Sequence, residues 1–162
     1  MNTEQHLLYN EMKTTMGRNC LILLLGFLGL GALGGGGALV ISPGGRLIGM
    51  PLSLLKKSPF HDFLIPGTVL FLLLGIAPCL LIFALIRKPA CTFAEKLNCY
   101  RDMHWSWTFS IYTAFILIAW IQLEMVFLQA VSWLHTFYMV LAIAILFVAL
   151  LPAVRSLYQK SI

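Results

Sequence analysis

The sequence predicts an all-α, multi-pass membrane protein, a four-helix transmembrane bundle with one short amphipathic connection outside the membrane. Of its 162 residues, 60% are hydrophobic and only 10% are charged, whereas soluble domains are roughly 25% charged. Four windows each reach the length of about 20 apolar residues that crosses a ~30 Å hydrocarbon core. Because they leave no room for a separate soluble domain, we treat residues 1–162 as a single domain.

The four predicted spans are 19–41, 64–86, 105–128 and 133–151. Before them, residues 1–18 form a polar segment in which Leu8, Met12 and Met16 recur at helical spacing. This spacing suits a short amphipathic helix on the membrane surface, and a frayed tail is equally compatible with it. The first apolar run exceeds the length of a signal-peptide core and lacks a small-residue cleavage site, so we expect it to remain as a membrane anchor.

Small residues gather in the first two spans, where they let helices approach closely in lipid. In the first span, Gly31 and Gly35 form a GxxxG step that Ala38 continues, and in the second Gly75 and Cys79 form a similar pair. We interpret these residues as a face for packing within the bundle or for a homo-oligomer. The first span also matches GxGxxG, but a dinucleotide site needs a preceding strand, and none is predicted.

The outer connection, residues 42–63, is too apolar and too rich in proline and glycine at defined positions to be a loose loop. Its Pro43-Gly44-Gly45 run ends the first span, because proline lacks the amide donor and glycine tolerates positive φ. Pro51 can begin a short surface helix, Pro51–Lys57. His61 and Asp62 follow just before the second span. We therefore expect an ordered amphipathic segment at the membrane surface.

Two prolines predict kinks in the second span. Pro66 falls early in it and Pro78 near its middle. Each lacks an N–H, so one carbonyl of the preceding turn is released from the helix. Inside a membrane, neighbouring helices or water must satisfy these carbonyls.

Basic residues are divided unequally between the two sides of the predicted membrane. With the N-terminus inside, the inner segments hold eight, namely Lys13, Arg18, Arg87, Lys88, Lys96, Arg101, Arg155 and Lys160. The outer segments hold three, Arg46, Lys56 and Lys57. This excess favours a cytoplasmic location for both termini. The net charge of +5 therefore follows membrane topology, and no nucleic-acid partner is predicted.

Polar residues concentrate near the outer ends of the third and fourth spans. Glu124 is an ionisable residue inside a span, and such residues are functional candidates by default. The candidate ligand-binding residues are Glu124, His135, Tyr138, His61, Asp62 and Trp120. They could converge on a quinone-like or lipid ligand, or on a proton path. The alternative is that Glu124 hydrogen-bonds a neighbouring helix while the others face interfacial water.

Motifs that indicate enzymatic chemistry are missing. The sequence contains none of the motifs HExxH, GxSxG, Walker A or CxxC. No motif therefore indicates a hydrolase, phosphate-binding or thiol-redox activity. His61, Asp62, Glu124 and His135 could ligate a metal by residue type, but their spacing does not support a metal site or an outer-leaflet enzyme built on them. We predict no catalytic residue, metal or cofactor.

The run GMPLSLLKKSPFHDFLIPG after a glycine-rich first span, with WIQ in the third span, resembles a group of small bacterial four-span integral membrane proteins of unknown function. The resemblance covers the whole chain and is strongest between Gly34 and Gly75. It implies a bacterial inner-membrane location and nothing about activity.

Together these patterns predict a non-enzymatic integral membrane protein of the cytoplasmic membrane. We expect it to bind a lipid-like small molecule or a partner membrane protein. The rival hypothesis is a small proton- or ion-coupled transporter or channel with Glu124 as the titrating group. The two differ in the effect of Glu124→Gln, which should be small for a scaffold or binding protein and should abolish transport in a transporter.

Overall fold

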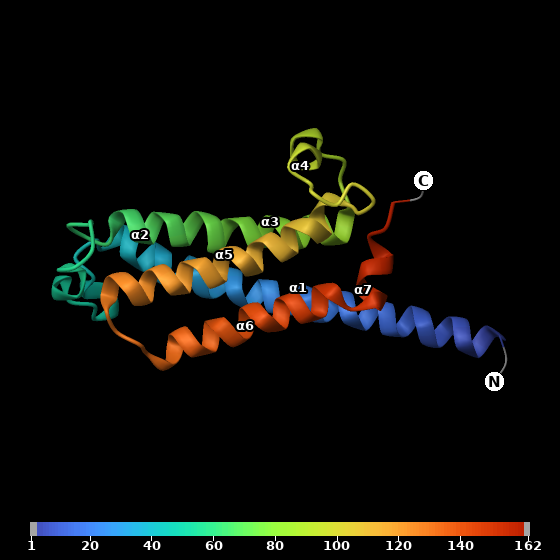
Figure 1. The fold of residues 1–162 in the computed structure, drawn as a ribbon, viewed down its shortest axis with the longest axis horizontal. Helices are drawn as coiled ribbons and strands as arrows, with labels where there is room; N and C mark the ends of the chain where they lie inside the picture. The colour runs from blue at the N-terminus through green and yellow to red at the C-terminus, as the bar shows by residue number, and fades with distance from the viewer. Residues whose placement is uncertain (1–2, 161–162) are drawn as a thin grey trace.

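The structure is a bundle of long helices (Figure 1). The computed structural model describes residues 3–160 and the side chains of Gln5 and residues 12–160, so the first two residues of the predicted segment 1–18 and the side chain of Leu8 lie outside this description. Four helices are long and apolar enough to span a membrane, namely Met12–Ile41, Leu64–Arg87, Trp105–Leu128 and Trp133–Leu150. No strand occurs between residues 3 and 160, which confirms the all-α fold class.

The first span lies in α1 (Thr3–Ile41), and the second consists of α2 (Leu64–Val69), η3 (Leu70–Ile76) and α3 (Ala77–Arg87). The third and fourth are α5 (Trp105–Leu128) and α6 (Trp133–Leu150). Short helices are η1 (Arg46–Ile48), η2 (Leu52–Leu55), α4 (Thr92–Lys96) and α7 (Pro152–Leu157). The helix predicted over Pro51–Lys57 is thus shorter and of the 3-10 type.

Both termini lie at one end of the bundle, as four spans require, and residues 42–63 cover the other end (Figure 1). We call residues 42–63 the cap segment and the end that they cover the cap end. The end with the termini, α4 and α7 is called the opposite end. These names carry no assignment to a side of the membrane.

α1 is one continuous helix of 39 residues. At ~1.5 Å per residue it is about 58 Å long, nearly twice the ~30 Å hydrocarbon core. Its first part projects past the other helices at the opposite end (Figure 1). The backbone of residues 3–18 therefore continues the first span, and it does not form a separate surface helix.

α1 and the second span approach each other at backbone distance. A Cβ atom added at Gly36 would lie 2.7 Å from the amide nitrogen of Phe71 and 2.9 Å from the carbonyl oxygen of Gly67. One added at Gly29 would lie 2.8 Å from Cys79 Sγ. At Gly36 only glycine fits without movement of the neighbouring helix, because the atoms it meets are backbone atoms, whereas at Gly29 the Cys79 side chain would have to rotate away. Gly36 is thus a residue of α1 that sets its distance from the second span.

The second span changes its hydrogen-bonding period between its two prolines. Leu70–Ile76 is a π-helix, and the amide of Ala77 donates to the carbonyl of Leu72, five residues earlier. The π-helix ends at Ile76, two residues before Pro78, which cannot donate to the carbonyl of Leu74. In Figure 1 α2, η3 and α3 nevertheless follow one continuous path.

Aromatic side chains take up backbone carbonyls that the helix ends leave without partners. Tyr158 donates its hydroxyl hydrogen to the carbonyl of Leu85 at 2.9 Å. The residue that would normally donate to this carbonyl is Pro89, which has no N–H. Trp107 Nε1 donates to the carbonyl of Ala149 at 2.8 Å, in the last turn of α6. Both aromatic side chains are almost fully buried, so these bonds seal the opposite end.

Tyr158 should make stability sensitive to alkaline pH. Burial raises its pKa from 10.0 to about 12, and the charge of Arg18 opposes this rise. Between these values the folded protein binds more protons than the unfolded chain, so stability falls as pH increases from about 10 to about 12. We expect the midpoint of thermal unfolding in detergent to fall more steeply over this interval for the wild type than for Tyr158→Phe. If the unfolding midpoints of the wild type and of Tyr158→Phe fell in parallel over this pH interval, ionisation of Tyr158 would not be the cause of the lost stability.

Candidate functional site

The cap segment is held on the bundle by a small hydrophobic cluster. Leu39 at the end of α1 packs with Leu55 and Phe63 of the cap segment. A turn at Gly45 makes this possible, with φ of 73° and a hydrogen bond from the amide of Met50 to the Gly45 carbonyl at 2.9 Å. A Cβ atom at Gly45 would clash with the Met50 carbonyl oxygen, so the turn requires glycine.

The cap segment is also attached to the end of α5. Lys57 Nζ donates to Oε1 of Gln129, the residue that ends α5. The ring of Phe60 packs edge-on against that of Phe127, with 5.9 Å between centroids. The cap segment is therefore an ordered cover that is attached to both α1 and α5.

Two neighbouring cavities lie beneath this cover. One of about 370 Å³ lies between the cap segment, α2 and α5. The other, of about 420 Å³, extends between α1, α5 and α6. Residues that line both are Gly35, Met50, Leu70, Trp120, Glu124 and Leu128. The walls are mostly apolar, and each volume falls in the range of roughly 300–1,000 Å³ that is typical of small-molecule sites.

Glu124 and His135 face each other at the second cavity. The amide of Ser132 donates to His135 Nδ1 at 3.0 Å, so a neutral imidazole here holds its proton on Nε2. His135 Nε2 lies 3.9 Å from Glu124 Oε2, which is too long for a hydrogen bond. His135 is 8% exposed. Its N–H and the carboxyl thus flank a gap where an oxygen atom of a ligand can interact with both.

Trp120 adds a second hydrogen-bond donor beside the same carboxyl. Its Nε1 is buried and lies close to the Glu124 carboxyl, but it does not reach the geometry of a full hydrogen bond with that group or with any other among residues 12–160. An unsatisfied buried donor costs about 1–3 kcal/mol, so an acceptor oxygen bound at this point would be stabilising. The hydroxyl of Tyr138 lies over Gly31, where an added Cβ atom would be 2.6 Å from it.

The structure separates the six predicted ligand-binding residues into two groups. Those that line the cavities are Glu124, His135, Tyr138 and Trp120. His61 is exposed, and Asp62 accepts a hydrogen bond from the amide of Leu64 at 3.0 Å, at the start of α2. Neither His61 nor Asp62 lines the two cavities. Among the residues described, no three His, Cys, Asp or Glu side chains lie close enough to hold a metal ion.

The small residues predicted as a packing or oligomer face also fall in different places. Gly31 and Gly35 line the cavity between α1, α5 and α6. Ala38 is half-buried. Gly75 and Cys79 contact α1. The cavity therefore owes part of its space to two glycines that have no side chain to fill it.

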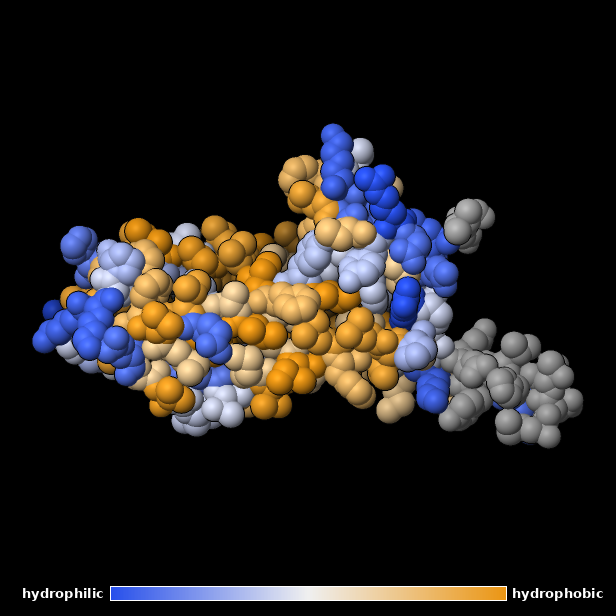
Figure 2. Space-filling view, viewed as in Figure 1, coloured by the Kyte–Doolittle hydropathy of each residue, from blue (hydrophilic) through white to orange (hydrophobic). Residues whose placement is uncertain are grey.

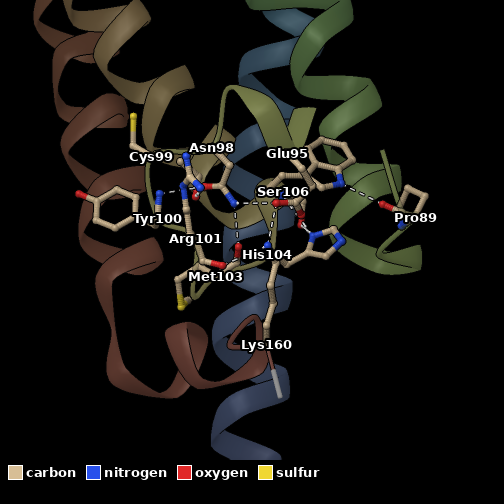
Figure 3. Close-up of polar contacts among 12 residues, drawn as sticks. Pro89, Glu95, Asn98, Cys99, Tyr100, Arg101, Met103, His104, Ser106 and Lys160 are labelled. Carbon is tan, nitrogen blue, oxygen red and sulfur yellow. Dashed lines mark hydrogen bonds and ion pairs between the residues drawn. The ribbon is translucent and has the colours of Figure 1, made fainter. Parts of the chain in front are cut away.

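A second polar cluster lies at the opposite end. Asn98 is 5% exposed, and its Nδ2 donates to the Met103 carbonyl at 2.8 Å and to Glu95 Oε2 at 3.2 Å (Figure 3). Its Oδ1 accepts hydrogen bonds from Thr108 Oγ1 at 2.6 Å and from the Tyr100 amide at 3.1 Å. Because the whole amide is satisfied, this cluster is structural: it fixes the connection between α3 and α5.

Comparisons with protein-family models, with curated proteins and with solved structures found no match to this chain. The four candidate spans indicate a class, a multi-pass α-helical membrane protein. Its chemistry has to follow from its own residues, and the cavities at the cap end bring together Glu124, His135 and the unpartnered Nε1 of Trp120.

Proposed function

We propose that this is a non-enzymatic integral membrane protein of the cytoplasmic membrane that binds a lipid-like small molecule at the cap end. The supporting observation is the convergence of His135 Nε2, Trp120 Nε1 and the Glu124 carboxyl on largely apolar cavities. An amphiphile matches this arrangement, because its chain can lie along the apolar walls while its head meets the polar groups.

The polar groups also indicate what kind of head the ligand has. Two N–H donors without protein acceptors favour a head with acceptor oxygens, such as a quinone carbonyl or the hydroxyl or ester of a lipid. No lysine or arginine lines either cavity, so an anionic head would be buried without a cationic side chain to pair with. The proposed ligand is therefore a neutral quinone-like or lipid molecule.

Filling the cavity should remove this ligand. At Gly35 the atom nearest to an added Cβ is Leu70 Cδ2 at 4.0 Å, so Gly35→Leu extends a side chain into both cavities. Gly34→Leu is the matched control, because Gly34 is exposed with nothing within 4 Å of an added Cβ. We expect native mass spectrometry from gentle detergent to find a stoichiometric lipid or quinone on the wild type and on Gly34→Leu but not on Gly35→Leu.

Two results would contradict the proposal. One is that all three proteins emerge without a ligand and with the same oligomeric state. The other is that Gly35→Leu keeps the same bound molecule as the control. Glu124→Gln preserves the shape of the site and tests the head group, since loss of the ligand in this variant would place the head beside the carboxyl.

A second candidate function is proton- or ion-coupled transport with Glu124 as the titrating group. It is favoured by the distance of 3.9 Å between His135 Nε2 and Glu124 Oε2. At this distance a single bridging water molecule can pass a proton from one group to the other. In proteoliposomes, Glu124→Gln should then abolish proton-coupled flux. Under the binding function there is no such flux in the wild type either.

The location in the cytoplasmic membrane, with both termini in the cytoplasm, is part of the proposal. It is supported by the division of basic residues, eight at the opposite end and on the N-terminal part of α1 against three in the cap segment. The resemblance to small bacterial four-span proteins points to the same membrane. A homo-oligomer or a partner membrane protein would use the lipid-facing side of α1, where Leu23 and Leu30 are exposed.

A further inference from the structure

The connection between α3 and α5 stands out sideways from the bundle around α4 (Figure 1). Its surface is divided, with hydrophobic atoms toward the middle of the bundle and hydrophilic atoms toward the termini (Figure 2). Phe93 is 72% exposed and Leu97 is 51% exposed. Lys96 and Arg101 are also exposed. An apolar surface next to a basic one is the pattern of segments that lie in a membrane interface.

A recess of about 410 Å³ opens beside α4. Its lining consists of Thr92, Glu95, Lys96, Arg101 and Lys160. Within the recess Lys160 and Glu95 form an ion pair, with Lys160 Nζ 2.7 Å from Glu95 Oε2, so their charges cancel. Burial raises the pKa of Glu95, but the hydrogen bonds from Lys160 and Asn98 hold it below its usual value, so the carboxylate stays ionised at neutral pH.

Two positive charges of the recess are left without an acidic partner. Lys96 and Arg101 have no ion pair among residues 12–160. The Lys160 ammonium also donates to the Arg101 carbonyl at 3.2 Å (Figure 3), which fixes the backbone of this side of the recess. The recess therefore has a net positive charge and a rigid wall.

The position of Trp105 indicates that the recess lies at the headgroup level of a bilayer. Trp105 begins α5, and its Nε1 donates to the Pro89 carbonyl at 2.9 Å, just past the end of α3. Tryptophan at the end of a span marks the membrane interface. The cations of the recess lie in the segment between these two span ends, where lipid phosphates are found.

We propose that residues 92–101 bind the phosphate headgroup of an anionic phospholipid. The phosphate lies between Lys96 and Arg101, whose guanidinium can hold two phosphate oxygens at once. The acyl chains lie along Phe93 and Leu97. A free phosphate would use the cations and leave the apolar residues in water, so the adjacent charged and apolar surfaces favour a lipid. This site is separate from the cavities at the cap end.

The test is a lipid titration of the detergent-solubilised full chain by native mass spectrometry. Phosphatidylglycerol and phosphatidylcholine with identical acyl chains are compared, and inorganic phosphate is the competitor. The variant is Lys96→Gln/Arg101→Gln, which keeps the Lys160–Glu95 pair. Its control, Arg46→Gln/Lys56→Gln, removes the same charge from exposed positions of the cap segment.

We expect the wild type and the control to prefer phosphatidylglycerol by about tenfold or more in Kd, and the variant to lose this preference. Phe93→Ser should weaken phosphatidylglycerol binding as well. Equal affinities for the two lipids in the wild type, or equal losses in variant and control, would overturn the proposal. Complete displacement of the lipid by millimolar phosphate would overturn it in favour of a free-anion site. Gly35→Leu should leave this binding unchanged, which separates the result from that at the cap end.

Discussion

Asn98→Ala will destabilise the protein by about 2–4 kcal/mol and release the connection between α3 and α5. The substitution removes four hydrogen bonds, to Glu95, Met103, Tyr100 and Thr108, each worth roughly 0.5–1.5 kcal/mol net. Two of these partners, the Met103 carbonyl and the Thr108 hydroxyl, are then left in a buried site. Thermal unfolding in detergent measures the loss of stability, and hydrogen exchange over residues 88–104 locates it.

Asn19→Ala is the matched control for this change. Asn19 is exposed on α1, and alanine is the better helix former by up to about 0.7 kcal/mol, so stability should be unchanged or slightly higher. If Asn98→Ala left the exchange of residues 88–104 at the wild-type rate, the amide would not be what organises this connection.

Gly36→Ala should lower the stability of the protein and Gly34→Ala should leave it unchanged or raise it, although the two positions are only two residues apart on one helix. At Gly36 the new Cβ would meet backbone atoms of Phe71 and Gly67 at 2.7 and 2.9 Å, so α1 and the second span must move apart. Overpacking of this kind costs about 1–3 kcal/mol. At Gly34 nothing lies within 4 Å, and the gain in helix propensity is about 1 kcal/mol.

The measurement is the unfolding temperature of both variants in the same detergent. A lower value for Gly36→Ala and an equal or higher value for Gly34→Ala would confirm that the glycine contact is specific. Similar changes in both would mean that helix propensity alone governs this part of α1.

The fold class was predictable because it depends on features that each segment shows by itself. Apolar length defines the four spans, and the breakers from Pro43 to Gly45 end the first helix. Glu124 could be identified as a candidate for the same reason, since an ionisable residue inside an apolar window stands out without knowledge of its neighbours.

The interior of the site depends on contacts between segments, and these have no local signal. Four consecutive glycines offer every side of α1 for close approach, so the sequence does not decide whether Gly35 or Gly36 faces the second span. Asn98 likewise resembles any polar loop residue until Met103 and Thr108 are brought to it. The walls formed by Met50 and Leu55 depend on the turn at Gly45.

The aromatic seal at the opposite end has an electrical consequence. Tyr158 and Trp107 occupy the carbonyls of Leu85 and Ala149 with almost fully buried side chains, so these two carbonyls are not free to bind water. Neither cavity beneath the cap segment has a lining residue from α7 or from the first turns of α5. A ligand of the proposed site would therefore enter and leave from the cap end or from the lipid, and the transmembrane voltage would fall mainly across the half of the bundle that ends at this seal.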